Sequence, residues 1–224
     1  MLRFTPEDHA LVTAAVTEAE RASDGEIVTI VTPKSDSYHD VGLHYAVLAM
    51  LLVPAALAAV PQSLIDWATA PLLGWNEALS RGMLMAFLFM KLAAVFLIVR
   101  YGLAWMPLRM ALTPGSTKSR RVRRRAVELF KASAEHRTHG RTGVLLYLSL
   151  LEHRAELVAD AAIHSKVAPE VWGDAMAALV AEVKAGRPAA GMAAAVEQVG
   201  AVLAEHFPKS SGDRDELPDR LIEL

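Results

Sequence analysis

The sequence contains no cysteine. This absence excludes disulfide frameworks, thiolate-bound metals and cysteine nucleophiles. A Gly-rich phosphate loop, a nucleophile elbow and an HExxH zinc motif are also missing. The chain does not open with a basic segment and a short apolar run, so we expect no cleavable signal peptide. The formal net charge is only -2, which argues against a general binder of nucleic acid.

Hydrophobic residues, in contrast, are abundant and unevenly distributed. They make up 53% of the chain, and the mean hydropathy of +0.28 is high for a soluble domain. The surplus falls almost entirely between Val41 and Leu112, while the flanking segments have the composition of ordinary globular domains. A length of 224 residues allows one or two domains.

Two apolar runs in this region are long enough to cross a membrane. Residues 41–60 carry no formal charge, and about twenty helical residues span a hydrocarbon core of about 30 Å. Pro54 would kink this helix, which a bilayer tolerates. The second run covers residues 83–108. We therefore predict a two-helix transmembrane hairpin over residues 41–112.

Two cations interrupt the second run, and a short link joins the runs. Lys91 or Arg100 would lie deep in the bilayer, where a cation costs about 2.5–3.5 kcal/mol on insertion scales. An ion or proton pathway, as in a small transporter or channel subunit, is one interpretation. A side chain that extends to the interface is the other, and the lack of an intramembrane carboxylate favours it. Trp67 and Trp75 of the link are expected interfacial anchors.

A dense basic block follows the second run. It comprises six cations, namely Lys118, Arg120, Arg121, Arg123, Arg124 and Arg125. Basic residues beside a span mark the cytoplasmic side, which predicts a multi-pass membrane protein with both termini cytoplasmic. The block could also bind anionic lipid, at about 1 kcal/mol per residue near the surface. Interleaved aromatic residues are missing, so we expect the bilayer, and not nucleic acid, as a partner.

The segment before the membrane predicts one helix and one strand. Thr5 and Pro6 begin a helix, of which one face is expected to carry Leu11, Ala15, Ala19 and Ala22. A short β-branched strand follows over residues 26–32. Because a single helix and a single strand cannot bury their apolar faces alone, their partners must lie beyond the membrane hairpin.

Those partners are recognisable after the basic block. Helical spacing recurs over residues 122–133, and a strand over residues 144–150 leads through a charged turn into a return strand over residues 154–159. Two helices follow. The first is expected to bury Val171, Trp172, Ala175, Met176, Leu179 and Val183, and the second Met192, Val196, Val199, Leu203 and Phe207.

The most economical fold is a small three-layer α/β/α sandwich interrupted by a two-helix transmembrane hairpin. Residues 1–40 and 113–208 form this domain, residues 41–112 form the hairpin, and residues 209–224 form a polar tail. The hairpin strands of residues 144–159 are expected to share a sheet with residues 26–32. The tail is expected to be loosely attached, with Leu221 and Ile222 as docking residues.

Three groups of residues resemble the TPM domain family. They are Gly25–Pro33, Gly143–Leu150 with the following Glu152-His153-Arg154, and Lys184-Ala185-Gly186. With the helices between them, the resemblance covers about Phe4–Pro33 and Arg120–Pro208. It also fits a bacterial membrane-protein branch, which implies the bacterial inner membrane as the location. It implies an α/β/α fold, and some family members are described as phosphatases. The family often has Asn where this sequence has Thr142.

The resemblance and the strand ends suggest candidate site residues. Family members that bind a divalent cation use acidic side chains near strand ends, which makes Asp160, Asp36 and Asp40 candidate ligands of Ca²⁺ or Mg²⁺. Arg141 and Thr142 are candidates for phosphate contacts. The alternatives are that Asp160 closes a turn through backbone amides and that Arg141 pairs with an acid.

Two further groups of polar residues carry side chains that can take part in chemistry. Glu152, His153 and Arg154 could supply an acid or base, or simply form a charged, soluble turn. His136 and His139 have helix-compatible ligand spacing, but no third ligand stands at a recognisable interval. Neither group predicts an enzyme by itself.

Three functions remain open at this level. The first is a membrane-anchored TPM-like module for protein interaction, assembly or quality control at the cytoplasmic face of the membrane. The second is a divalent-cation-dependent, acid-phosphatase-like hydrolase of low specificity. The third is the small transporter or channel subunit suggested by the cations of the second run.

Overall fold

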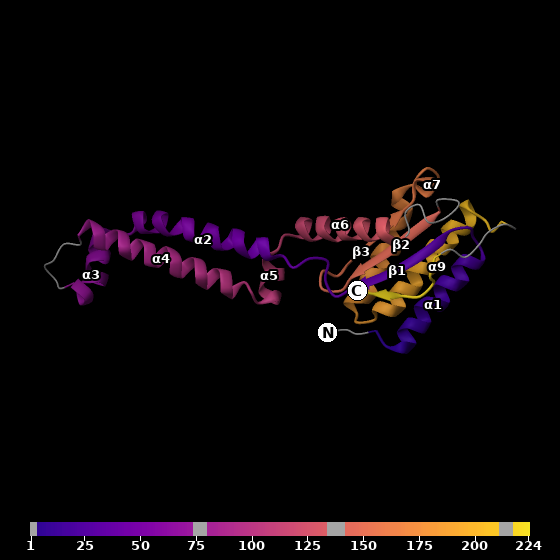
Figure 1. Ribbon diagram of the computed structural model, residues 1–224, viewed down its shortest axis with the longest axis horizontal. Helices are drawn as coiled ribbons and strands as arrows, with labels where there is room; N and C mark the ends of the chain where they lie inside the picture. Colours follow the sequence, from indigo (N-terminus) through magenta and orange to yellow (C-terminus); the bar gives the residue numbers. More distant parts are fainter. Residues whose placement is uncertain (1–3, 74–79, 134–141, 211–216) are drawn as a thin grey trace. The chain divides into compact units, whose positions relative to one another are not determined.

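The computed structural model describes residues 4–73, 80–133, 142–210 and 217–224 (Figure 1). The chain divides into two compact units. Met1–Asp36 and Pro114–Leu224 form the first, which we call the α/β unit, and Ser37–Thr113 form the second, which we call the helical unit. The helical unit is therefore an insertion within the α/β unit.

A four-stranded sheet of order β3-β2-β1-β4 forms the centre of the α/β unit. Its strands are β1 (Glu26–Thr32), β2 (Gly143–Ser149), β3 (Arg154–Ala159) and β4 (Ile222–Glu223). Strand β1 is parallel to β2 and β4, while β2 and β3 are antiparallel. The predicted pairing of the hairpin with the strand that precedes the insertion is confirmed, and β3 lies at an edge.

Both central strands are buried along their whole length. Side chains alternate between the two faces of a strand, so β1 and β2 contribute to two hydrophobic clusters. Ile27 and Val31 belong to one cluster, whereas Val28 and Ile30 belong to the other. The apolar, partly β-branched sequence of these strands follows from this burial on both faces.

Three helices pack on the first face, namely α1 (Pro6–Arg21), α8 (Gly173–Lys184) and α9 (Pro188–His206). The Thr5 side chain accepts a hydrogen bond from the Asp8 backbone, which confirms the predicted start of α1. The face predicted for α1 is confirmed at Ala15 and Ala19, which belong to or pack against the main hydrophobic cluster, and wrong at Leu11 and Ala22, which are exposed. Val12 and Val16 are buried, while Leu11 is 47% exposed, because the inward stripe runs through the two valines and Ala15.

Helix α6 (Gly115–Ser133) packs on the other face through Val122, Ala126 and Phe130. Two short elements precede α8, namely α7 (Ala161–His164) and a 3-10 helix, η1 (Pro169–Trp172). Trp172 is buried as predicted, whereas Val171 is 48% exposed. The 3-10 geometry rotates Val171 out of the register that an α-helix from Pro169 would have given it.

The C-terminal segment takes part in the sheet. Leu217 and Leu221 are buried, and β4 pairs with Ile30 and Val31 of β1. A hydrogen bond of 2.6 Å joins the Thr17 hydroxyl to the Asp219 carboxylate. The expected docking through the end of the tail therefore takes the form of a short edge strand.

The helical unit contains α2 (His39–Ala59), α3 (Gln62–Leu73), α4 (Arg81–Gly102) and α5 (Met106–Leu112). Helices α2 and α4 pack along each other (Figure 1). Both are long and apolar enough to cross a membrane, with mean hydropathies of 2.0 and 2.4 over their most apolar windows. The second predicted helix, over residues 83–108, is wrong at its end. The chain turns after Gly102, and Pro107 stands at the start of a separate helix.

The buried side chain of Arg109 links two segments of the helical unit. Its side chain is only 2% exposed, and it donates hydrogen bonds of 2.7 Å to the carbonyl oxygens of Leu103 and Ser37. These bonds join the residue that ends α4 to the segment that precedes α2. The buried cation is thus held by backbone carbonyls, as burial of a charge requires.

Candidate functional site

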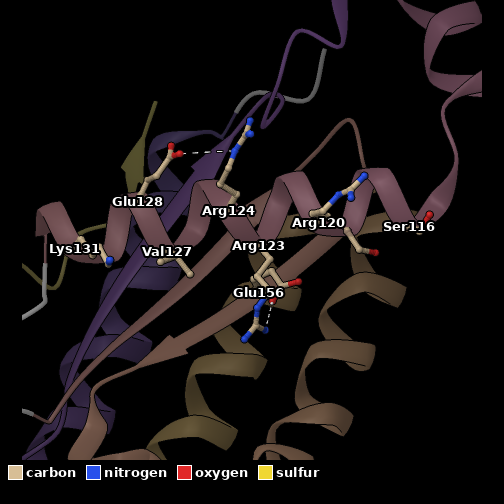
Figure 2. Close-up of a pocket in the computed structure, with 9 residues that line it drawn as sticks. Ser116, Arg120, Arg123, Arg124, Val127, Glu128, Lys131 and Glu156 are labelled. Atoms are coloured by element: carbon tan, nitrogen blue, oxygen red, sulfur yellow. Dashed lines mark ion pairs between the residues drawn. The ribbon is translucent and has the colours of Figure 1, made fainter. Parts of the chain in front are cut away.

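A cationic groove runs along α6 at the edge of the sheet (Figure 2). Its volume is about 710 Å³, and we call it the α6 groove. It is lined by Ser116, Ser119, Arg120, Arg123, Arg124, Val127, Glu128 and Lys131 of α6 and by Glu156 of β3. Four cations against two carboxylates give the lining a positive balance, which favours an anionic ligand.

Part of the basic block has a structural role. The carboxylate of Asp36 pairs with Arg121 at 3.0 Å and with Arg124 at 3.2 Å. The side chains of Arg121 and Asp36 are only 15% and 19% exposed, so this pair is shielded from solvent. It fastens α6 to the segment that follows β1. These arginines therefore stabilise the α/β unit in addition to contributing positive charge.

Two carboxylates of the groove also lie near arginines of α6. Glu156 lies 3.6 Å from Arg123, and Glu128 lies 3.8 Å from Arg124 (Figure 2). Glu128 also lies 3.5 Å from Arg125. Burial raises the pKa of Glu156 above its ordinary value, although the nearby positive charges of Arg123 and Arg154 act in the opposite direction. Burial in the groove therefore disfavours the ionised form of Glu156.

A network of buried polar groups lies near the carboxyl end of β1. The Tyr147 hydroxyl is 2.7 Å from the Thr32 hydroxyl and 2.9 Å from the Ser35 hydroxyl. Glu152 accepts hydrogen bonds from the Ser35 backbone and the Ser149 hydroxyl, and its side chain is buried. The turn residue Glu152 thus ties the hairpin to the chain after β1. This arrangement gives it a structural role in place of the solubilising one expected.

Asp160 lies at the other end of the sheet. It is 5% exposed, and its carboxylate accepts a 3.2 Å hydrogen bond from the Gly143 backbone, while its own N–H donates to the Gly143 carbonyl. Thr142 is also buried there, and its hydroxyl donates to the Asp24 carbonyl at 2.7 Å. Both side chains bond to the backbone where β1 and β2 begin.

The structure does not bring Asp160 and Asp36 together. Asp160 stands beside Gly143, at the amino ends of β1 and β2, whereas Asp36 lies beyond the carboxyl end of β1. The seven-residue strands keep these ends about 20 Å apart along the sheet. The prediction placed the residues that follow β1 and β3 at the same edge of the sheet. Because β3 runs antiparallel to β1 and β2, these residues lie at opposite edges. Asp40 belongs to the first turn of α2, in the helical unit.

Other candidates supply no further metal set. Within residues 4–73, 80–133, 142–210 and 217–224, no three His, Asp or Glu side chains are grouped closely enough to hold a metal ion. Arg141, His136, His139 and Trp75 lie outside the described residues. In the helical unit, Lys91 is exposed and Arg100 is half-buried on α4.

Neither the α6 groove nor the buried hydroxyl network was predicted from the sequence. The basic block was recognisable, but its division into paired and groove-lining residues depends on where α6 meets Asp36 and β3. Glu156 belongs to the return strand predicted over residues 154–159. Its alternation with Ala155 and Leu157 carried no sign of the cation beside it.

Fold and site together define a mixed α/β protein with a four-stranded sheet and an inserted pair of long apolar helices. Its fold is similar to that of the BA42 protein from the psychrophilic bacterium Bizionia argentinensis, solved by NMR. The TM-score is 0.56 at 17% sequence identity, covering 99% of this chain and 95% of that chain. No protein-family model and no curated protein matches the sequence.

Proposed function

We propose that this protein is a membrane-anchored interaction module, in which the helical unit spans the bilayer twice and the α/β unit binds a protein partner at the cytoplasmic face. The partner process is assembly or quality control of membrane proteins. The observation that carries the proposal is the parallel pairing of β1 with β2 on either side of the insertion. Strands of one sheet must lie on one side of a membrane, and two spans return the chain to the side it left.

The surface of the inserted helices supports anchorage. In the apolar windows of α2 and α4, 17% and 0% of the residues are buried, so most of their apolar side chains face outward. Phe89 and Ile98 of α4 are 68% and 70% exposed. Apolar helices with such surfaces require a nonaqueous environment or another protein surface. A bilayer supplies that environment along the full length of both helices.

The basic block supports the orientation. The cations of Lys118–Arg125 follow the second apolar helix closely, and basic residues near a span favour the cytoplasmic side. Both termini belong to the α/β unit and would share that side. The resemblance to a bacterial membrane-protein branch of the TPM family supports the bacterial inner membrane as the compartment.

We further infer a three-layer α/β/α arrangement and a TPM-like fold for the α/β unit. The two hydrophobic clusters support the first, because α1, α8 and α9 meet one face of the sheet and α6 meets the other. The TPM-like fold is supported by the sequence resemblance at the segments that contain β1 and β2. The phosphatase alternative needs Asp160 to act with another acid, and the distance from Asp36 gives it no support.

The topology is tested with reporters fused through a linker after Leu224 and within residues 74–79. The C-terminal fusion is expected to report a cytoplasmic location, and the fusion between the helices an extracytoplasmic one. The same location for both fusions would contradict two spans. An exchange of the two expected locations would overturn the orientation but keep the anchorage.

The interaction is tested by affinity purification in mild detergent with identification of co-purifying proteins. A matched control carries the same two apolar helices joined to an unrelated soluble domain. Proteins that co-purify with the full chain and not with the control support binding by the α/β unit. If the full chain and the control recover the same proteins, the α/β unit is not the interaction surface.

A further inference from the structure

The residues that line the α6 groove have a regular spacing along the helix. The orientation of a membrane span does not require such a spacing. Orientation depends on the number of basic residues near a span, not on their spacing. Ser116, Arg120, Arg123, Val127 and Lys131 of the groove recur at intervals of three or four residues, which places them on one stripe of the helix. The stripe lies next to the buried side chains of α6, where the helix meets the edge strand β3.

Several cations of the stripe are available for a ligand. Arg120 and Lys131 are exposed, and neither has a carboxylate partner among the residues that the structure describes. Arg123 is 73% exposed, and its contact with Glu156 is 3.6 Å long. By contrast, Arg121 is 15% exposed and is committed to Asp36. The groove therefore presents guanidinium groups that are positioned but weakly neutralised.

The lining matches a phosphate group in chemistry and in size. Guanidinium groups bind phosphate through paired N–H donors, and the exposed Ser116 adds a hydroxyl at one end of the groove. Val127 provides an apolar contact between the cations. A volume of about 710 Å³ is ample for a lipid headgroup.

Chain connectivity favours a lipid over a soluble phosphate. Only residues 103–115 separate the last residue of α4 from Ser116, so a span by α4 would keep the groove close to the membrane surface. Anionic headgroups are concentrated at that surface, and each nearby cation adds about 1 kcal/mol of attraction, or roughly five-fold in affinity.

We propose that the α6 groove binds the phosphate-bearing headgroup of an anionic phospholipid, through Arg120, Arg123 and Lys131. This inference rests on the proposed membrane anchorage. Glu156 occupies the groove as an internal competitor for Arg123, so its neutralisation is expected to strengthen lipid binding. The bound lipid would fix the α/β unit against the membrane with α6 facing the headgroups.

The absence of cysteine allows a direct test in the full chain. A Ser116→Cys variant places one thiol in the groove, and an Ala201→Cys variant places one on the exposed surface of α9. Each protein is reconstituted in lipid nanodiscs of phosphatidylcholine alone or with phosphatidylglycerol. The rate of modification by an uncharged maleimide is then measured. An uncharged reagent avoids enrichment or depletion at the charged surface.

The proposal expects phosphatidylglycerol to slow modification at Ser116→Cys and to leave Ala201→Cys unchanged. Adding Arg120→Gln and Arg123→Gln is expected to weaken binding roughly 25-fold and abolish the protection. The charge-matched pair Lys184→Gln and Arg220→Gln lies outside the groove and is expected to preserve it. Adding Glu156→Gln is expected to give protection at a lower fraction of phosphatidylglycerol, whereas Glu197→Gln, on α9, is not.

Other outcomes would overturn the proposal in distinguishable ways. If the chain stays in the discs but phosphatidylglycerol leaves the Ser116→Cys rate unchanged, the groove assignment fails and anchorage stands. If inorganic phosphate protects Ser116→Cys in phosphatidylcholine discs, the ligand is a soluble phosphate and the lipid assignment fails. If both charge-reduced pairs lose protection equally, binding is a property of net charge. A chain that the discs do not retain contradicts the anchorage as well.

Discussion

The hydroxyl oxygens of Thr32 and Tyr147 lie 2.7 Å apart, although the two residues are 115 positions apart in the sequence. Thr32 ends β1 before the helical unit, and Tyr147 belongs to β2 after it. The Tyr147 side chain is fully buried, and its hydroxyl also approaches Ser35 at 2.9 Å. This bond therefore reports directly whether the two halves of the α/β unit are joined.

Replacement of Tyr147 by Phe is expected to destabilise the α/β unit by about 1–3 kcal/mol, because it leaves two partner hydroxyls without the phenol. The measurement is the urea midpoint of unfolding of the full chain in detergent, with the folded fraction at each urea concentration determined by pulse proteolysis. In a double-mutant cycle with Thr32→Val, we expect a coupling energy above about 0.5 kcal/mol. Additive effects would mean that this hydroxyl pair contributes nothing specific.

Gly200 marks the closest approach of α9 to α1. A Cβ atom at this position would lie 2.5 Å from the Cβ of Ala19, so Gly200→Ala forces the helices apart. We expect a loss of about 1–3 kcal/mol in unfolding free energy. Gly173→Ala is the control, because Gly173 has helical dihedral angles and, apart from its chain neighbours and the backbone of its own helix, no atom of the described residues lies within 4 Å of its added Cβ. A loss as large at Gly173 would contradict the packing explanation.

Replacement of Glu156 by Gln is expected to stabilise the protein near neutral pH. The folded-state pKa of Glu156 is raised above 4.5, so its stability contribution is full below about pH 4.5 and decreases as pH rises through the folded value. Glutamine stays neutral throughout. The gain in Tm over the natural protein should therefore shrink toward zero as pH falls.

Glu182 provides the opposite case for the same measurement. Its hydrogen bond with Arg187 lowers the pKa of this exposed carboxylate, so its contribution is present above the unfolded pKa and lost as pH falls. Glu182→Gln is expected to cause at most a small loss, greatest near neutral pH. If both variants shift Tm in the same direction at neutral pH, burial is not the cause at Glu156.

The side chain of Leu221 holds the C-terminal segment in place. It is 3% exposed within the main hydrophobic cluster, so Leu221→Ala is expected to cost about 2–5 kcal/mol. Leu224→Ala is the matched control, because Leu224 is 53% exposed and its loss should change stability by less than about 0.5 kcal/mol. Equal urea midpoints for the two variants would show that the tail is not part of the stable core.

Replacement of Asp160 by Ala separates a structural from a catalytic role. The carboxylate accepts the Gly143 N–H in a buried position, so we expect a loss of about 1–3 kcal/mol in stability. Any phosphomonoesterase activity of the purified chain, expressed per folded molecule, is expected to remain unchanged. A variant that folds fully but loses such activity would restore Asp160 as a catalytic candidate.

Local patterns predicted much of the secondary structure because each depends on neighbouring residues. Thr5 and Pro6 determine the start of α1, and the β-branched run from Glu26 to Thr32 determines β1. The pairing of β1 with the later hairpin could also be predicted, since neither segment can bury its apolar residues alone. The end of α4 could not, because hydropathy continues through Gly102 while the helix does not.

The candidate sites were less predictable because they depend on strand direction and on contacts distant in sequence. Asp36 and Asp160 both follow strands, but β1 and β3 run in opposite directions. Glu156 gained its significance only from Arg123, which lies on a different element. Likewise, Arg121 could not be distinguished from Arg120 before the position of Asp36 was known.

The insertion between β1 and β2 also constrains synthesis. Strand β1 is apolar on both faces, and its partner β2 leaves the ribosome only after more than a hundred further residues. At about 5–20 residues per second, β1 waits roughly 6–20 s without its neighbour. Throughout this interval the helical unit is being synthesised. Until β2 emerges, β1 has an unpaired edge that can pair with the β1 strand of another chain. The nascent chain must therefore keep β1 away from such strands during this interval.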